Sequence, residues 1–180
     1  MRRAGAESAM SHTAARYDFR DKPADYARLG EELAALLAGE RDLIANAANT
    51  AALLFEALPE VNWAGFYFLK EGALLVGPFQ GRPACVRIAL GAGVCGTAAR
   101  ERRTLLVPDV HQFAGHIACD PLSRAEVVVP LLAGGELLGV LDLDSPRAGR
   151  FDAADARGLE ALAAVFVASL AADAARPRRG

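Results

Sequence analysis

The apolar run Leu137–Asp144, which follows the pair Gly134-Gly135, constrains the fold more than any other segment. Alternate side chains of a β-strand point to opposite faces, so Leu138 and Val140 share a face with the two aspartates. Leucines occupy the other face. Apolar residues on both faces are typical of a strand that is covered on both sides. The sequence therefore predicts that this strand lies inside a layered domain.

Helical and strand-like patterns fill most of the chain. Helical spacing predicts helices over 23–39, 41–57, 94–101 and from Asp152 to about 170. Strand-like patterns occupy 62–69, 73–79, 85–90, 104–107, 126–132 and 136–144. Hairpin-like connections favour an α+β fold, in which a largely antiparallel sheet of about six strands carries the N- and C-terminal helices on one side. We expect one domain at 17–172 between a disordered tail (1–16) and a C-terminal tail (173–180), with the irregular segment 108–124 as a lid or binding loop.

Length and charge exclude several classes of function. The chain has 180 residues, which suits one domain with a substantial core. Its formal net charge of −2, from 20 basic and 22 acidic residues, gives no electrostatic reason to bind nucleic acid or an anionic membrane. No apolar run approaches the roughly 20 residues of a membrane-spanning helix, and no hydrophobic signal segment follows the N-terminus. We therefore expect a cytoplasmic protein.

The three cysteines of the chain, Cys85, Cys95 and Cys119, lie in one 35-residue stretch. In the cytosol such cysteines are more often catalytic, metal-binding or inert than paired in structural disulfides. Cys95 stands at a predicted helix start, which favours a thiolate, whereas Cys85 also fits the role of a small buried hydrophobe. Cys119, in the irregular segment, has the most exposed setting. The alternative is a zinc site with His111 and His116 as further ligands, although no Cys-x-x-Cys pair is present.

Carboxylates gather near the end of the apolar strand. Asp142 and Asp144 share a face, and burial with mutual repulsion would raise at least one pKa; the alternative is that both are solvated at a strand end. Glu126 opens the preceding strand. A strict two-residue turn at the glycine pair would turn Glu126 away from the aspartates, whereas a longer connection or a bulge would put all three on one face. We expect the longer connection or the bulge.

Trp63 and Tyr67 share a face of the strand predicted at 62–69. They either pack on the sheet or form the wall of a pocket for a small apolar or sulfur-containing group. Thiols able to reach one another beside a set of acids are what a thiol-based redox enzyme requires. A thiolate attacks, an acid protonates the departing oxygen, and a second thiol resolves the product.

Several segments together resemble the free methionine-(R)-sulfoxide reductases, which are single GAF-type domains. The resemblance runs from about Tyr17 to about Leu170. The segments that carry it are Asn62–Tyr67, Gly77–Gly81, Pro83–Ile88, Gly91–Gly96, Cys119–Asp120, Glu126–Leu131 and Gly139–Ser145. The strand and helix-start motifs occur in GAF domains generally, whereas the three cysteines in their local contexts are specific to the reductases.

The resemblance implies a reaction and a role for each candidate residue. Cys119 would be the nucleophile, and Cys85 or Cys95 would resolve its sulfenic acid. Trp63 and Tyr67 would hold the methyl-sulfur end of the substrate, with Glu126, Asp142 and Asp144 contacting it. The substrate would be free methionine sulfoxide and the reductant an external dithiol such as thioredoxin, with no bound cofactor.

The resemblance also leaves some points open. Ala125 stands where the family pattern leads us to expect a serine, so any hydrogen bond from that serine is lost. The alternative function is a GAF module that senses a small ligand without chemistry. Neither the sequence nor the resemblance decides whether the chain forms a homodimer.

Overall fold

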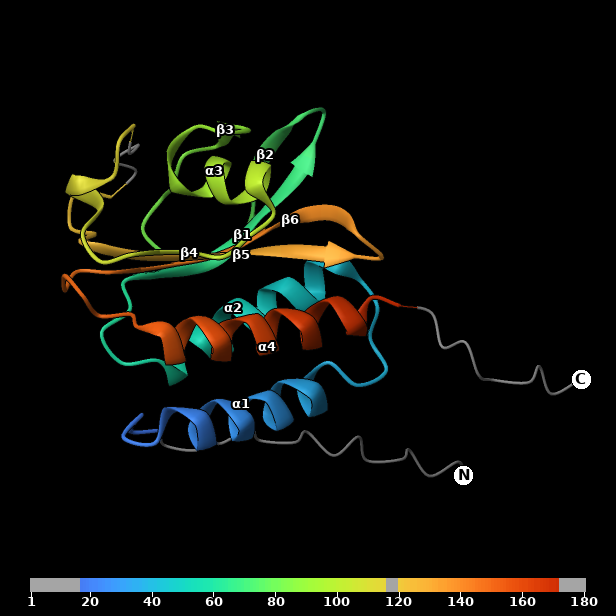
Figure 1. Cartoon of the computed structure of the whole chain (residues 1–180). Coiled ribbons are helices and arrows are strands. Elements are labelled where there is room, and N and C mark those ends of the chain that lie inside the picture. The colour runs from blue at the N-terminus through green and yellow to red at the C-terminus, as the bar shows by residue number, and fades with distance from the viewer. Residues whose placement is uncertain (1–16, 116–119, 172–180) are drawn as a thin grey trace, which may run out of the picture.

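The computed structural model describes residues 17–115 and 120–171. Its centre is a six-stranded antiparallel sheet in the order β3-β2-β1-β6-β5-β4 (Figure 1). The strands are β1 (Trp63–Lys70), β2 (Ala73–Gly81), β3 (Arg87–Ala89), β4 (Leu105–Val107), β5 (Ala125–Ala133) and β6 (Glu136–Ser145). The predicted antiparallel sheet is confirmed.

Helices cover the two faces of the sheet unequally. The helices α1 (Lys22–Leu36), α2 (Leu43–Ala57) and α4 (Ala153–Ser169) lie on one side, with α2 and α4 against the strands and α1 packed on α4 (Figure 1). The short helix α3 (Gly93–Glu101) lies on the other side (Figure 1). The long helices therefore share one face, as predicted, and leave the opposite face to α3 and the loops.

β6 is buried on both faces, as its apolar pattern indicates. Leu141 and Leu143 are fully buried in the core that the sheet forms with the three long helices. Val140 is fully buried in a second core between the sheet and α3. Each such leucine or valine contributes about 1.5–3 kcal/mol through the apolar surface that it removes from water. The two cores explain why apolar residues occupy both faces of this strand.

A bulge in β6 sets the register of the hairpin. Ala133 pairs with Glu136 across the two glycines, but Leu131 pairs with Gly139, so Leu138 is an extra residue. Gly139 has a φ of 157°, and a Cβ there would lie 2.1 Å from the Tyr67 carbonyl oxygen, which leaves room for glycine alone. The expectation of a bulge is confirmed.

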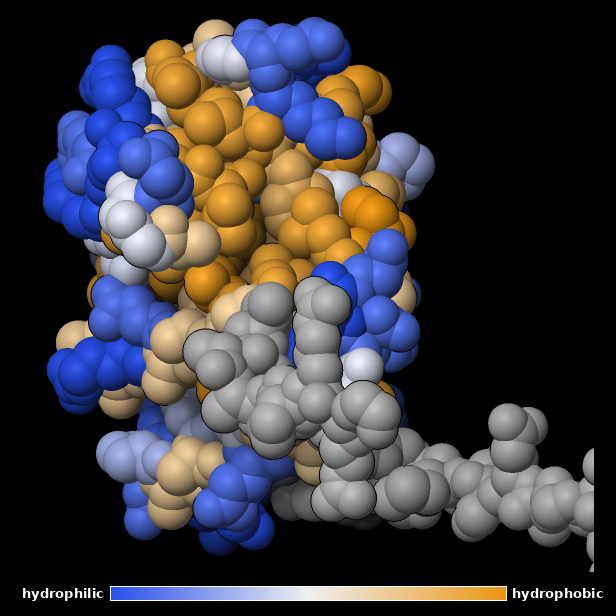
Figure 2. All heavy atoms as spheres, turned by 90° about the vertical axis from the view of Figure 1, so that its right-hand side faces the viewer, coloured by the Kyte–Doolittle hydropathy of each residue, from blue (hydrophilic) through white to orange (hydrophobic). Residues whose placement is uncertain are grey.

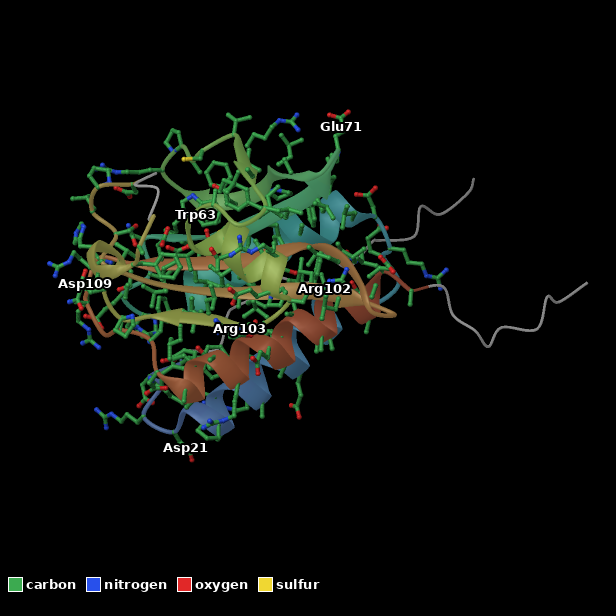
Figure 3. The ribbon with its side chains drawn as sticks, turned by 45° about the horizontal axis from the view of Figure 1, so that its top comes forward. Asp21, Trp63, Glu71, Arg102, Arg103 and Asp109 are labelled. Carbon is green, nitrogen blue, oxygen red and sulfur yellow. The ribbon has the colours of Figure 1, made fainter. Side chains whose placement is uncertain are left out.

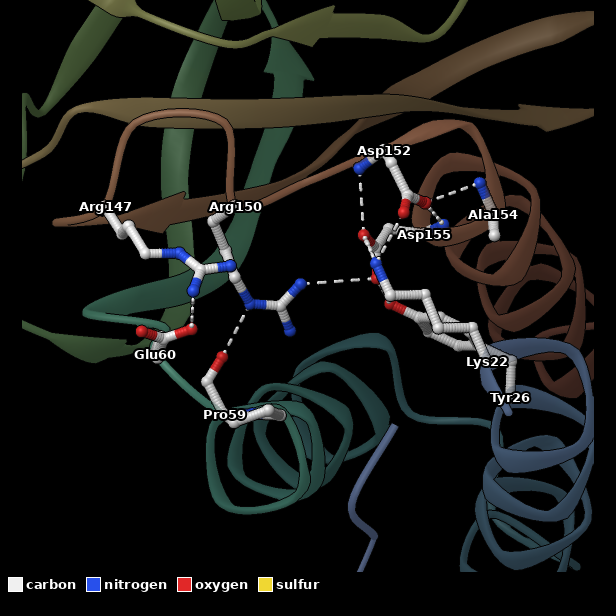
Figure 4. A network of polar contacts seen from close by, with 9 residues as sticks. All are labelled: Lys22, Tyr26, Pro59, Glu60, Arg147, Arg150, Asp152, Ala154 and Asp155. Atoms are coloured by element: carbon white, nitrogen blue, oxygen red, sulfur yellow. Dashed lines mark hydrogen bonds and ion pairs between the residues drawn. The ribbon is translucent and has the colours of Figure 1, made fainter. Parts of the chain in front are cut away.

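A buried ionic network ties α1 to α4 (Figure 4). The fully buried Asp155 lies 3.4 Å from Arg150 Nη1, and its carboxylate accepts hydrogen bonds from Lys22 Nζ at 2.6 Å and from the Tyr26 hydroxyl at 3.0 Å. Arg150 Nε donates to the Pro59 carbonyl oxygen at 2.9 Å. One carboxylate thus joins the first turn of α1, the loop before α4 and, through Arg150, the end of α2.

We expect Asp155→Ala to lower the free energy of unfolding by about 3–5 kcal/mol, because it leaves the buried Arg150 without its carboxylate partner. Denaturant unfolding measures the change. The matched control is Glu60→Ala, which removes the exposed ion pair between Glu60 and Arg147 (3.0 Å) and should change stability by less than about 1 kcal/mol. Equal effects of the two substitutions would contradict the importance of the buried network.

An apolar hollow opens at the end of the molecule where β6 begins. Figure 2 shows apolar side chains gathered on this face. The hollow is lined by residues that include Leu43, Phe68, Leu69, Leu132, Leu137, Leu138 and Leu170. These residues lie at the opposite end of the β5–β6 hairpin from Glu126, Asp142 and Asp144.

Across the described residues, no helix combines the length and apolar character needed to cross a membrane.

Candidate active site

Three strands bring the candidate acids and aromatic residues to one pocket on the α3 side of the sheet. Because of the bulge, Glu126 on β5 pairs with Asp144 on β6, and the three acids share a face. Trp63 on β1 pairs with Asp144 from the other side. The pocket is lined by Trp63, Tyr67, Pro83, Ala84, Ile88, Ala92, Gly93, Val94, Cys95, Asp120, Ser123, Glu126, Asp142 and Asp144. Figure 3 looks towards this side of the sheet, with Trp63 labelled.

Aromatic rings form one wall of the pocket. Trp63 stacks on Tyr67 with ring centroids 5.8 Å apart and on Phe79 with centroids 5.2 Å apart. Gly65 lies between Trp63 and Tyr67 in the sequence. A Cβ at this position would come within 2.8 Å of the Trp63 ring and 2.3 Å of Phe79. Trp63 Nε1 donates a hydrogen bond to the Arg82 carbonyl oxygen at 3.1 Å. These contacts fix the orientation of the indole ring, so that it can form a rigid wall of the pocket.

The acids are largely removed from water, so the alternative that Asp142 and Asp144 are solvated strand-end groups is wrong. Glu126 and Asp142 are only 7% and 6% exposed, and Asp144 is half-buried. Burial raises the pKa of Asp142 to about 7. Burial first, and then repulsion from the neighbouring carboxylates, raises the pKa of Glu126 and that of Asp144 well above their usual ranges. The cluster therefore holds protons more tightly than solvated carboxyl groups do.

One carboxylate oxygen in this cluster has no hydrogen-bond partner within the part of the chain that the structure describes. Asp142 Oδ1 is buried, and no group of the described residues donates a hydrogen bond to it. A buried acceptor without a donor is costly, by about 1–3 kcal/mol. The pocket is therefore suited to a ligand that brings a hydrogen-bond donor to this oxygen.

The cysteines occupy different environments. Cys95, near the start of α3, is a buried free thiol whose Sγ donates to Glu126 Oε1 over 3.7 Å. Burial, followed by the charges of Asp142 and Glu126, raises the pKa of this thiol, so the expectation that the helix start favours a Cys95 thiolate is wrong. Cys85 is half-buried and disulfide-bonded, and Ala84 beside it lines the pocket. Cys119 lies outside the described residues.

The zinc alternative gains no support from the histidine that the structure describes. His111 is exposed on the short 3-10 helix Val110–Gln112 and does not line the pocket, and His116 lies outside the described residues. Cys95, Glu126 and Asp142 place ligand atoms within 4.8 Å of one another, a spacing that a metal ion can bridge. Carboxyl groups and a thiol that line one small pocket give this spacing without a metal ion, so we assign no metal to it.

Sequence reasoning missed the polar residues at the pocket rim. Asn62 Nδ2 lies 3.2 Å from Asp120 Oδ2 and 3.1 Å from Ser123 Oγ, and both of these partners line the pocket. Asn62 and Asp120 lie in segments that carry the family resemblance, but no local pattern indicates that these two residues and Ser123 meet. Ala125 is fully buried in the core on the helix side, so a serine there would point away from the acids.

The chain matches a family model, a curated relative and solved structures. The GAF domain family model matches residues 44–171. The chain is 51% identical over 139 residues to the free methionine-R-sulfoxide reductase of Escherichia coli, covering 77% of this chain and 84% of that protein. Its structure is similar to that of the Neisseria meningitidis enzyme of the same name in complex with its substrate (42% identity, TM-score 0.82, 87% of this chain and 95% of that chain). A substrate complex of the Staphylococcus aureus fRMsr is also similar (49% identity, TM-score 0.78, 81% and 95%).

Proposed function

This chain belongs to the free methionine-R-sulfoxide reductase family of GAF domains, and from that membership we propose that it reduces free methionine (R)-sulfoxide to methionine. The observation that carries the proposal is the convergence of two buried carboxyl groups, a half-buried third and a stacked aromatic wall on one pocket. The aromatic wall suits the methyl-sulfur end of the substrate, and the carboxylates suit its ammonium group.

The acids have two tasks in this scheme. An ionised carboxylate binds the substrate ammonium, and the unpartnered Asp142 Oδ1 is an acceptor suited to one of its hydrogens. A carboxylic acid that its surroundings keep protonated gives a proton to the sulfoxide oxygen. A peptide-bound methionine sulfoxide has no ammonium group to offer, which explains the selection of the free amino acid.

The thiols supply the two electrons. The Cys119 thiolate attacks the sulfoxide sulfur to form an S–S bond, and the sulfoxide oxygen takes up two protons and leaves as water. A water molecule then attacks the Cys119 sulfur, the S–S bond breaks, a proton is released, and methionine leaves with Cys119 as a sulfenic acid. A second thiol condenses with the sulfenic acid, which releases water and forms a disulfide. An external dithiol, for which we propose thioredoxin, reduces this disulfide, and the reaction needs no bound cofactor.

We favour Cys85 as the second thiol. It is the disulfide-bonded cysteine among those described, and its neighbour Ala84 lines the pocket. Cys95 is buried, and its raised pKa keeps it as a thiol, which makes it the slower partner. Because the cycle needs reduced thiols, we place the enzyme in the cytoplasm.

The reaction is tested by single turnover of the fully reduced protein. We expect it to release one methionine per chain from free methionine (R)-sulfoxide and to lose two thiols. The (S)-epimer and an N-acetylated sulfoxide serve as controls and should release none. Loss of no thiols with any sulfoxide would support a ligand-sensing GAF module instead.

The resolving step gives a separate prediction. Cys85→Ser and Cys95→Ser should each still release methionine in a single turnover, because the first attack needs only Cys119. Thioredoxin-dependent recycling should fall by about tenfold or more in Cys85→Ser and change little in Cys95→Ser. Steady-state assays with thioredoxin measure the recycling rate of each variant. Wild-type recycling by both variants would show that the sulfenic acid is reduced directly.

A further inference from the structure

Two segments of the chain meet at the outer rim of the pocket, and the first of them contains the disulfide-bonded Cys85. The first segment, 82–86, precedes β3, and the second, 120–124, precedes β5. Arg82 Nη1 lies 4.0 Å from Asp120 Oδ1, and both segments contribute side chains to the pocket wall. Their exposed residues, here called the rim surface, are Arg82, Pro83, Val86, Pro121, Leu122 and Arg124.

The rim surface carries two large apolar side chains that are open to solvent. Val86 is 66% exposed and Leu122 is 52% exposed. Single exposed apolar residues are common on protein surfaces, but apolar side chains that gather at a functional point mark contact sites for other molecules. Val86 follows Cys85 directly, and Leu122 lies two residues after Asp120, which lines the pocket. Both apolar side chains therefore lie next to the chemistry.

Hydrogen bonds hold the backbone of both apolar residues in place. The Val86 carbonyl oxygen accepts a hydrogen bond from the Val76 N–H at 3.0 Å, which ties the first segment to β2. The Leu122 N–H donates to Asp120 Oδ1 at 2.9 Å. The Arg124 N–H donates at 2.7 Å to the last carbonyl oxygen of β6. A surface that is ordered before binding loses less conformational entropy when a partner docks on it.

The exposed charges of the rim surface are positive. The side chains of Arg82 and Arg124 are 64% and 44% exposed, whereas the one acid of the two segments, Asp120, is only 8% exposed. Arg124 pairs with Asp109 at 3.2 Å, so Arg82, at 4.0 Å from Asp120, keeps more of its charge available to a partner. Acidic side chains on the partner would complement this charge.

We propose that the rim surface is the docking site of the protein dithiol that reduces the disulfide, a partner with an apolar surface and acidic side chains around its reactive cysteine. The inference rests on the proposed function and deepens it, because it says where thioredoxin binds. One thiolate of the partner attacks a sulfur of the disulfide, which forms a mixed disulfide and releases the other cysteine as a thiolate. The partner's second thiolate then attacks the mixed disulfide. The chain takes up two protons and keeps two thiols, and the partner leaves as a disulfide.

The test compares reduction of the same disulfide by thioredoxin and by dithiothreitol, a dithiol too small to need a docking surface. The protein is oxidised to the disulfide beforehand, so that no sulfoxide is involved, and thiol counting follows the reaction. Val86→Asp and Leu122→Asp each place a charge in the apolar contact and should lower the second-order rate constant with thioredoxin by about tenfold or more. The rate constant with dithiothreitol should stay within about twofold of wild type. Arg82→Glu should lower the rate constant with thioredoxin by about threefold, and by less at high salt.

Ile44→Asp is the matched control. Ile44 is 54% exposed on α2, which lies on the other face of the sheet from the pocket, and its replacement should leave both rate constants unchanged. A wild-type rate constant with thioredoxin in both Val86→Asp and Leu122→Asp would overturn the docking site. An equal loss with dithiothreitol would also overturn it, since the variants would then disturb the disulfide itself. A wild-type chain whose disulfide thioredoxin reduces, but which releases no methionine from the sulfoxide, would instead overturn the proposed function.

Discussion

Cys119→Ser is expected to abolish reduction of free methionine (R)-sulfoxide with every reductant, by more than about 10³-fold. A serine hydroxyl is far less nucleophilic than a thiolate and cannot form the sulfenic acid. Asp120, the next residue of the chain, is 8% exposed and lines the pocket beside the three acids. The comparison is best made by single turnover, which separates the first attack from recycling.

Cys95→Ser is the matched control for this experiment, since it replaces a cysteine that lies beside Glu126. It should still release methionine in the first turnover. Mass spectrometry of the Cys85→Ser variant after one turnover should find the added oxygen on Cys119. Substantial methionine release by Cys119→Ser would show that another thiol is the nucleophile.

Asp142→Asn and Asp144→Asn are expected to lower the single-turnover rate of methionine release by about 10²–10⁴-fold. An amide can neither give a proton to the sulfoxide oxygen nor carry the charge that the ammonium group needs. Glu136→Gln, an exposed carboxylate at the opposite end of β6, is the control and should leave the rate unchanged. Less than threefold loss in both aspartate variants would remove these residues from the mechanism.

Asp142→Asn, which should lower the activity, should not lower the free energy of unfolding at pH 7. Its pKa is raised to about 7 in the folded protein, so the unfolded chain loses this proton at lower pH than the folded one. The wild-type free energy of unfolding therefore falls as pH rises from about 4 to 7 through this group. Asp142→Asn removes that loss, and at pH 7 it should be as stable as wild type or more stable. Denaturant unfolding at pH 5 and pH 7 measures the difference.

The sequence alone was enough to predict the elements of the fold. The glycine pair, the apolar run of β6 and the helical leucine spacing act over a few residues, and each reflects local backbone geometry or which face is buried. The same local patterns put Asp142 with Asp144 and Trp63 with Tyr67, because alternation along one strand needs no knowledge of its neighbours. The thiols and acids indicated redox chemistry, and their segments carried the family resemblance.

Only the tertiary structure decided how these pieces combine. The bulge at Leu138 turns Glu126 towards the aspartates, and it depends on the close approach of Gly139 to the Tyr67 carbonyl of another strand. Burial made Cys95 a thiol where its helix position alone predicted a thiolate, because desolvation outweighs the dipole. Asn62 and Ser123 are 61 residues apart, and only folding brings them together. Register, desolvation and long-range hydrogen bonds are properties of neighbours in space, which a local pattern does not record.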